Sequence, residues 1–159
     1  MHRRGHTNHS GFPQRNAYTV HPKPHGGNNL NFPDEFLDLL NEESKALLYL
    51  ATLMPDGSPQ VTPVWFESDG EHILVNTNEG RAKDRNMRAR PKVAMTIQDP
   101  NDAYRYLGIR GVVVGSTREG ADEHINKLSL KYDNKPWIRK QNQRRIIFKI
   151  KPTHFDLHN

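Results

Sequence analysis

The chain has 159 residues, enough for one ordinary domain with a real hydrophobic core. It has no cysteine, which excludes disulfides, thiolate metal sites and cysteine nucleophiles and agrees with a reducing cytoplasm. The formal charge of +5 belongs largely to the first 30 residues, because the cations there precede the first acid, Asp34, and the rest of the chain is close to neutral.

The first 30 residues are rich in histidine, glycine, proline and asparagine, with only scattered apolar residues. Such a segment cannot bury enough surface to offset its ordering entropy, so residues 1–30 are predicted to form a disordered basic arm. Its histidines are irregularly spaced and no acid accompanies them, which favours disorder over a metal site. The arm lacks the apolar stretch of a signal peptide, and no run elsewhere approaches membrane-spanning length. We therefore expect a cytoplasmic protein without a membrane segment.

Residues 31–159 are predicted to form the folded domain. Strands are expected at residues 45–54, 59–66, 72–77, 93–98, 104–117 and 144–151, and helices at 33–40, 81–90 and 120–132. Asp56-Gly57 and Asp69-Gly70 turns join the first three strands into an antiparallel meander. Glycines in the fifth strand, among them Gly111 and Gly115, indicate bulges or sharp coiling. Six mostly antiparallel strands with inserted helices predict a mainly β fold with minor α, arranged as a small closed barrel.

The segment after the third strand carries most of the functional signal. His72–Thr77 leads directly into a helical stretch with five cations and one acid, which Pro91 stops. A strand that runs into a helix N-terminus leaves backbone N–H groups unpaired and adds a partial positive charge, which together suit a phosphate. Arg81 and Lys83 in the first turn would add charged donors. A solvated basic helix face explains this segment equally well, and Asp84 is expected to be a surface charge.

The second strand, Pro59–Phe66, contains a proline that cannot donate to a sheet ladder. Pro63 is therefore predicted to lie at a sheet edge, at a bulge or at the mouth of a site. Free backbone groups there could meet the polar edge of a flat ring. A plain edge strand with core aromatics is an equally good interpretation of this strand alone.

The familiar protein-borne catalytic patterns are missing from the sequence. There is no Gly-x-Ser-x-Gly, no His-Glu-x-x-His and no Walker loop. The histidines of the folded domain are far apart in sequence, and each is expected to be satisfied or exposed, so no metal site is predicted; they are His72, His124, His154 and His158. If the protein is an enzyme, a bound cofactor would supply the chemistry.

Several segments together resemble one known family in order and spacing. They are Ala51–Trp65, Val75–Thr77, Gly80–Met87, Arg105–Gly111 and Gly120–Ile125. The chain is identified as a member of the pyridoxamine 5'-phosphate oxidase-like split-barrel superfamily. Within it, the chain is most similar to the deazaflavin-dependent oxidoreductases that use coenzyme F-420.

The resemblance implies a six-stranded antiparallel split β-barrel with flanking helices, and a homodimer that binds FMN or coenzyme F-420 at the subunit interface. It implies three groups of cofactor-binding residues. The phosphate group would be held by Thr77, Arg81 and Lys83, with Asn76 beside it. The ring would lie along Val61, Thr62, Pro63 and Val64. Contacts from the partner subunit would come from Tyr106 and Arg110.

The chain departs from the pyridoxamine phosphate oxidases proper. Ala82 separates Arg81 from Lys83, whereas that branch has an adjacent Arg-Lys pair, and the chain ends soon after Phe155. We therefore do not expect oxidation of pyridoxamine phosphate.

The leading hypothesis is an oxidoreductase that transfers hydride between the cofactor and a small conjugated acceptor. Coenzyme F-420 is favoured over FMN on the resemblance, and Arg85 and Arg88 would suit its acidic tail. No catalytic residue is assigned. Tyr104 and Tyr106 are candidate proton donors, although packing is the more favoured role for both.

Two other functional classes remain open from the sequence. One is a non-catalytic split-barrel protein that holds flavin or haem as a sensor or carrier. The other is a nucleic-acid-binding protein that uses the basic arm and the basic helix. The second is less favoured because the chain has no aromatic-interleaved basic surface motif.

Overall fold

The computed structural model describes residues 30–159, so the predicted arm lies, except for Leu30, outside the described residues. The strands are β1 (Leu47–Leu53), β2 (Pro59–Val64), β3 (Phe66–Ser68), β4 (Ile73–Asn78), β5 (Lys92–Gln98), β6 (Tyr106–Thr117) and β7 (Arg145–His158). The helices are the 3-10 turn η1 (Asp34–Phe36), α1 (Leu37–Leu40), α2 (Ala82–Ala89) and α3 (Ala121–Asp133). No described helix has both the length and the apolar character needed to cross a membrane.

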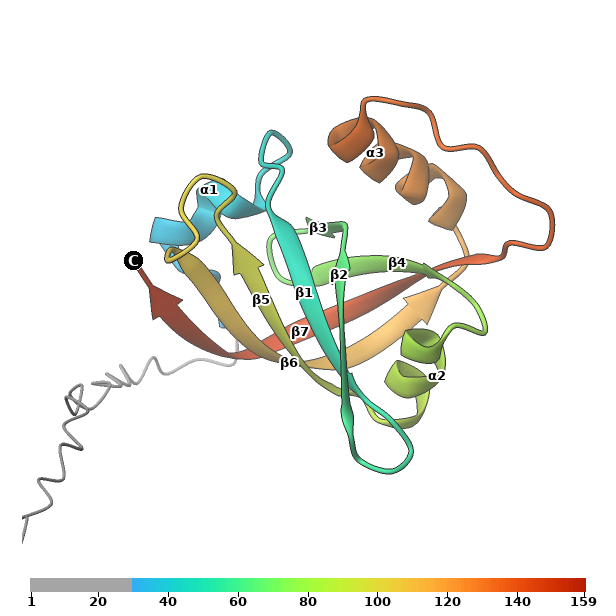
Figure 1. The fold of residues 1–159 in the computed structure, drawn as a ribbon, viewed down its shortest axis with the longest axis horizontal. Helices are drawn as coiled ribbons and strands as arrows, with labels where there is room; N and C mark the ends of the chain where they lie inside the picture. Colours follow the sequence, from blue (N-terminus) through green and yellow to red (C-terminus); the bar gives the residue numbers. More distant parts are fainter. Residues whose placement is uncertain (1–29) are drawn as a thin grey trace, which may run out of the picture.

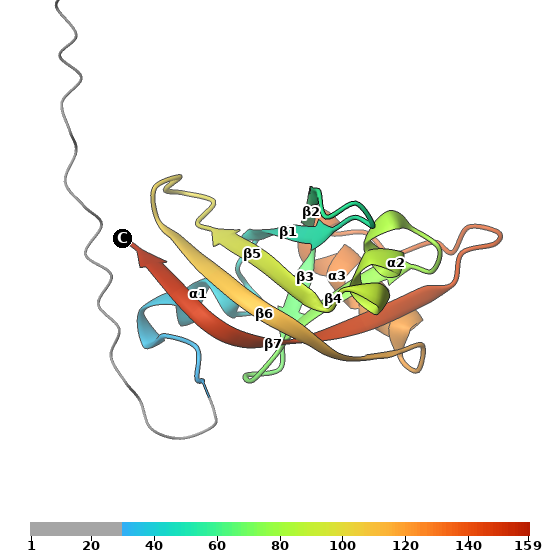
Figure 2. The ribbon, with the colours of Figure 1, turned by 90° about the horizontal axis from the view of Figure 1, so that it is seen from below.

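All seven strands form one antiparallel sheet in the order β2-β1-β5-β6-β7-β4-β3. The sheet curls strongly, so that its outer strands approach each other (Figures 1 and 2). The prediction of a mainly β, antiparallel split barrel is confirmed.

The sheet has seven strands rather than the six that were predicted, because the second predicted strand is divided at Trp65. Its first part, β2, pairs with β1, and its second part, β3, pairs with β4. One strand cannot follow both partners along a curled sheet, so it changes partner at the bend. The two edges of the sheet are thus consecutive pieces of the same segment.

The long strands β6 and β7 form the back of the barrel and carry the predicted bulges. Their register shifts between Arg110 and Gly111 and again between Val113 and Gly115. A Cβ at Gly111 would come within 2.9 Å of Ile150 Cγ2. The close approach of β7 therefore requires glycine at this bulge.

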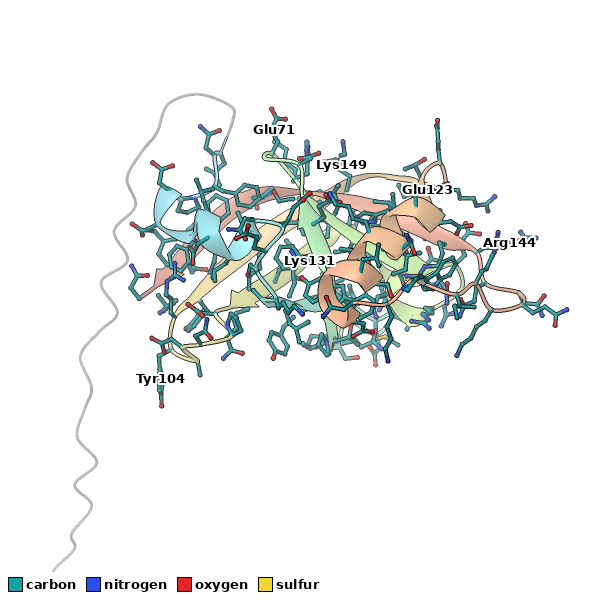
Figure 3. The ribbon with its side chains drawn as sticks, turned by 90° about the horizontal axis from the view of Figure 1, so that it is seen from above. Glu71, Tyr104, Glu123, Lys131, Arg144 and Lys149 are labelled. Carbon is teal, nitrogen blue, oxygen red and sulfur yellow. The ribbon has the colours of Figure 1, made fainter. Side chains whose placement is uncertain are left out.

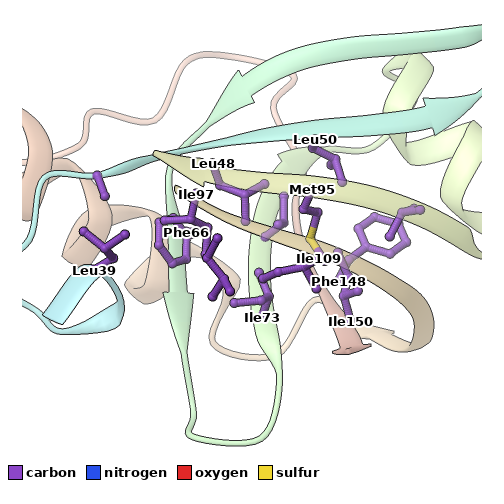
Figure 4. Packing of buried hydrophobic residues seen from close by; sticks show 14 of the residues in the cluster. Leu39, Leu48, Leu50, Phe66, Ile73, Met95, Ile97, Ile109, Phe148 and Ile150 are labelled. Atoms are coloured by element: carbon purple, nitrogen blue, oxygen red, sulfur yellow. The ribbon is translucent and has the colours of Figure 1, made fainter. Parts of the chain in front are cut away.

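The core consists of apolar side chains on the inner face of the curled sheet, closed at one end by Phe36 and Leu39 of the N-terminal helical turns. Figure 4 shows this packing. The strand residues at its centre are Leu48, Leu50, Phe66, Ile73, Met95, Ile97, Ile109, Phe148 and Ile150. Met87 of α2 joins the same cluster, so the basic helix is fixed to the barrel by its apolar side.

Candidate functional site

The candidate site is formed by the end of β4 and the first turn of α2. Gly80 turns the chain between them with a φ of 82°, a conformation that other residues seldom adopt. Arg81 is the N-cap residue and offers no side-chain acceptor, so neither the helix nor its cap pairs the N–H groups of the first turn. The strand-to-helix geometry expected from the sequence is present.

Asp84 is a structural carboxylate, not the surface charge that was predicted. The residue is only 4 % exposed. One oxygen accepts the Gly80 N–H at 2.7 Å, and the other accepts Arg88 Nε at 2.7 Å. An acid in the first turn can reach back to the N–H groups that precede the helix, and the positive helix end favours it there. Asp84 therefore fixes the turn that carries Arg81.

The later cations of α2 have structural partners. Arg88 pairs with Glu79 at 3.3 Å as well as with Asp84. Arg90 donates from Nε to the carbonyl of Leu53 at 2.7 Å, which ties the end of the helix to β1. Arg85 donates to the carbonyl of the loop before the helix. These contacts hold the helix in place and use much of the donor capacity of its second half.

Arg81 and Lys83 are different. Within the described part of the chain, neither side chain makes an ion pair or a hydrogen bond. Arg81 is exposed and Lys83 is half-buried. Both stand at the positive end of α2, where a cation is unfavourable without an anion beside it.

A third cation, Arg145, joins them from the first position of β7. It lies opposite Asn78 of β4 in the sheet register. Its Nε donates to Asn76 Oδ1 at 2.7 Å, and its NH1 group donates to Asn78 Oδ1 at 2.9 Å. Arg145 could not be identified as a site residue from the sequence, because only the pairing of β4 with β7 brings it to the site.

The three cations, which we call the cation cluster (Arg81, Lys83 and Arg145), repel one another. Burial and then the charges of Arg81 and Arg145 lower the pKa of Lys83. Burial and then Arg81 lower the pKa of Arg145 to about 10, while Asp122 opposes this. Asp122 itself pairs with Arg139 at 3.1 Å. The cluster thus holds concentrated positive charge with no carboxylate of the described residues paired to it.

Asn76 and Thr77 are both buried at the end of β4, but on opposite faces of the strand. Thr77 alternates with the core residues Ile73 and Val75, so its side chain lies on the inner face. Asn76 lies on the other face with Asn78, where both contact Arg145. The structure therefore groups Asn76, but not the side chain of Thr77, with Arg145. The role of Thr77 in phosphate binding stays a prediction.

Behind Asn76 lies a buried polar network that the sequence does not reveal. Asn76 Nδ2 donates to the carbonyl of Ala121 at 2.8 Å and lies 3.2 Å from His124 Nδ1. His124 Nε2 lies 3.2 Å from a carboxylate oxygen of Glu67 on β3. Burial lowers the pKa of His124, while Glu67 opposes this. No group of acids and histidines in the described residues has the geometry to hold a metal ion.

Glu67 also lines a cavity of about 470 Å³, which lies between the loop after α1 and helix α3. There, Lys127 bridges Glu67 and Glu42, the latter at 2.5 Å. The charges in this cavity are matched, in contrast with the cation cluster.

The predicted ring-binding segment is the edge strand β2, which confirms the edge position of Pro63. Val61 is 59 % exposed, and among the described residues no strand pairs with the outer side of β2. Helix α2 contacts the strand beside this edge: Asn86 Nδ2 donates to Thr52 Oγ1 of β1 at 3.0 Å, and Thr52 is paired with Gln60 of β2. Through α2 and β1, the cation cluster is thus connected with the β2 edge.

Tyr106 and Arg110 are not near the cation cluster within one subunit. Tyr106 pairs with His158 and stacks on its ring at 4.2 Å between centroids, and Arg110 pairs with His154. Arg145 is at the opposite end of β7, roughly 30–40 Å away along the strand. Their predicted contact from a partner subunit is not tested by a single chain and stays a prediction.

Comparison with known proteins identifies the family. A family model described as pyridoxamine 5'-phosphate oxidase matches residues 32–159. The chain belongs to this family.

Solved structures with the same fold include an F-420 reductase, which is 36 % identical, with 79 % of this chain and 98 % of that chain covered and a TM-score of 0.70. A conserved hypothetical protein from Mycobacterium tuberculosis is 20 % identical over 83 % of this chain and 88 % of its own, with a TM-score of 0.61. The heme storage protein HutZ from Vibrio cholerae is 16 % identical over 81 % of this chain and 96 % of its own, with a TM-score of 0.57. The latter two likenesses concern the fold alone.

Proposed function

We propose that this protein is an oxidoreductase that binds a phosphate-bearing deazaflavin or flavin and transfers hydride to or from a small conjugated acceptor. The observation that carries this proposal is a cation cluster beside the N-terminus of α2 that no carboxylate of residues 30–159 pairs, connected through α2 and β1 to the edge strand β2. When bound, the ring cofactor supplies the hydride chemistry. The chain's own residues bind and orient it.

The phosphate end of such a cofactor fits the cation cluster. Arg81 and Lys83 are free to donate charge-assisted hydrogen bonds, and the first-turn N–H groups of α2 add donors of the same sign. Burial and then the charges of Arg81 and Arg145 lower the pKa of Lys83, and a bound dianion would favour its charged form. Arg81 and Lys83 are therefore assigned to phosphate binding, with Asn76 beside them.

The ring end fits the edge strand. Pro63 has no N–H to donate, and no strand within residues 30–159 pairs with the outer side of β2. Val61–Val64 can therefore present backbone groups and apolar side chains to a flat ring. A second subunit packed on this region would exclude water from the ring, and Tyr106 and Arg110 are the residues we assign to that contact. This part of the proposal requires a homodimer.

Coenzyme F-420 is favoured over FMN. The support is the 36 % identity to an F-420 reductase over 98 % of that chain. The expected contribution of Arg88 to an acidic cofactor tail is not favoured, because this side chain is engaged by Asp84 and Glu79. FMN remains the alternative, since both cofactors present a phosphate to the same cations.

The direct test is to purify the protein from a host that makes both cofactors and to record absorbance and mass spectra of the bound material. A deazaflavin spectrum with the matching mass is the expected result. Paired flavin bands would replace coenzyme F-420 with FMN. Protein without either ring would overturn the proposal, and a bound ring that never exchanges hydride with any acceptor would favour a carrier or sensor.

A further inference from the structure

Arg145 is held in an unusual way for a half-buried arginine. Its two anchored donors, Nε and NH1, bind the amide oxygens of Asn76 and Asn78 at 2.7 and 2.9 Å. Neither partner carries a charge, and no described carboxylate lies within ion-pair distance of Arg145. Amide oxygens orient a guanidinium without cancelling its charge.

The orientation of one clamping amide is itself fixed. Asn76 Oδ1 must face Arg145, which can only donate, so Asn76 Nδ2 faces the Ala121 carbonyl and His124 Nδ1. His124 Nδ1 can accept this N–H only in the neutral tautomer that carries its proton on Nε2, on the side of Glu67. The buried network thus keeps the amide oxygen directed at Arg145.

The rest of the guanidinium remains available. An arginine has five N–H donors, and the contacts with Asn76 and Asn78 leave the NH2 group without a partner among the described residues. Trp137 lies near the group, with its ring centroid 6.0 Å from Cζ. Arg145 is paired with Asn78, and the Asn78 carbonyl accepts the Arg81 N–H at 3.4 Å, so the free donors stand at the start of α2, where the phosphate ligands assigned above lie.

We infer that Arg145 is a third, preorganised ligand for the phosphate monoester of the cofactor, held by the neutral clamp of Asn76 and Asn78. This role rests on the proposed function and adds a residue from the last strand to the phosphate site. Because its position is set before the ligand arrives, little side-chain entropy is lost on binding. A guanidinium also suits a phosphate better than an ammonium, since it can donate two parallel hydrogen bonds.

A purely structural Arg145 would serve only to join β7 to β4, and two variants separate the possibilities. Arg145→Gln removes the charge and most donors. Asn78→Asp keeps the size of the clamp and its hydrogen bond to Arg145, but it supplies a carboxylate that neutralises the guanidinium. A structural arginine would be held as well or better by this carboxylate.

The experiment titrates wild type and both variants with coenzyme F-420, FMN and inorganic phosphate, and records the melting temperature of each protein. We expect both variants to weaken binding of the preferred cofactor and of phosphate by about 10- to 100-fold, the effect of one lost charge-assisted hydrogen bond. Asn78→Asp should keep or raise the melting temperature. Lys149→Gln, an equal charge change further along β7, is the matched control and should leave affinity unchanged; Figure 3 shows Lys149 well away from Arg144 at the start of β7.

Wild-type affinity in Arg145→Gln would overturn the role of Arg145 while leaving the proposed function intact. If Arg145→Gln does not fold, Asn78→Asp decides: unchanged affinity in that variant would overturn the role in the same way. A wild type that binds neither cofactor nor phosphate would overturn the proposed function and this inference together.

Discussion

Two arginines at opposite ends of the barrel are anchored in opposite ways. Arg105, directly before β6, donates to Asp38 at 2.7 Å and to Asp99 at 2.8 Å, and these carboxylates raise its pKa. Arg145, at the start of β7, donates to two neutral amides, and burial with the charge of Arg81 lowers its pKa to about 10. The neighbouring residues Tyr104 and Arg144 mark these two ends in Figure 3.

The difference indicates what each arginine does. The charge of Arg105 is neutralised where it stands, and its further hydrogen bond to the Glu35 carbonyl at 2.7 Å holds the N-terminal turn against the sheet. It also lies over the ring of Phe36, with Cζ 5.1 Å from the centroid. Arg145 is positioned equally firmly but keeps its charge, as do Arg81 and Lys83. At one end of the barrel, ion pairs of an arginine stabilise the fold. At the other end, the positive charge of the arginine is not neutralised and is available to a ligand.

The largest effect is expected from the double variant Arg81→Ala/Lys83→Ala. Each lost charge-assisted hydrogen bond weakens binding by about 10-fold or more, so cofactor affinity should fall by at least about 100-fold. The melting temperature should stay the same or rise, because the variant removes repulsion rather than attraction. Equilibrium titration and thermal unfolding of the same samples test both points. If the double variant binds the cofactor as tightly as the wild type does, the cation cluster does not bind the phosphate.

The mirror experiment is Arg105→Ala. This variant removes the ion pairs with Asp38 and Asp99 and the contact with the ring of Phe36, so the melting temperature should fall by roughly 4–8 °C. Cofactor affinity of the folded protein should remain within about 2-fold of wild type at a temperature below the transition. An unchanged melting temperature would show that the paired arginine does not fasten this end.

The contacts that hold Arg145 and those that hold Arg105 should also lose their contribution to stability in different pH ranges. Burial keeps the pKa of His124 below its ordinary value of 6.5, so below pH 6.5 the unfolded chain binds a proton that the folded chain refuses. Stability should therefore decrease as pH falls below 6.5, by at most about 1.4 kcal/mol per pH unit for this one group. The groups that face His124 and bear on this titration are Glu67, Lys127 and Arg145.

The ion pairs of Arg105 with Asp38 and Asp99 contribute to stability over a different pH range. The pKa of Asp38 is held below 3.8 chiefly by Arg105, and the pKa of Asp99 by the Asn101 N–H and then by Arg105. The contribution of these ion pairs is therefore present above pH 3.8 and is lost only below it. His124→Asn keeps an acceptor near Asn76 without the titration, and it should flatten the stability profile between pH 5 and 6.5. Urea unfolding at several pH values checks this, and a slope that persists in His124→Asn would assign the effect to another group.

The smallest effect is expected from Arg85→Gln. Arg85 is exposed and donates to a loop carbonyl, so its removal should change cofactor affinity by less than about 3-fold. The comparison with Arg81→Gln, an identical substitution one helical turn earlier, shows whether the cations of α2 divide as the contacts suggest. Equal losses in the two variants would contradict this division.

Much of the fold could be predicted from sequence because its signals are local. Asp-Gly turns, the period of each strand and the stop at Pro91 depend on neighbouring residues, and they placed most strands and α2 within a few residues. The last strand was predicted to end at residue 151, but β7 continues along β6 to His158. The break at Trp65 could not be predicted, because it results from a change of pairing partner along a curled sheet.

The site could be predicted only where one segment carries it. Arg81 and Lys83 follow a strand in sequence, so they could be identified before the structure was known. Arg145 could not, because it is brought to Asn78 by the register of β4 and β7. Asp84 was expected on the surface because its burial depends on how the turn at Gly80 folds back over it.

The central claim is that the cation cluster exists to bind the phosphate of a ring cofactor. The most direct measurement compares the affinity of the wild-type protein for the cofactor with which it copurifies and for the same ring on a ribityl chain without the phosphate. We predict that the phosphate-free compound binds at least about 100-fold more weakly, and that most of this difference disappears in Arg81→Ala/Lys83→Ala. Equal affinities for the two compounds in the wild type would contradict the claim.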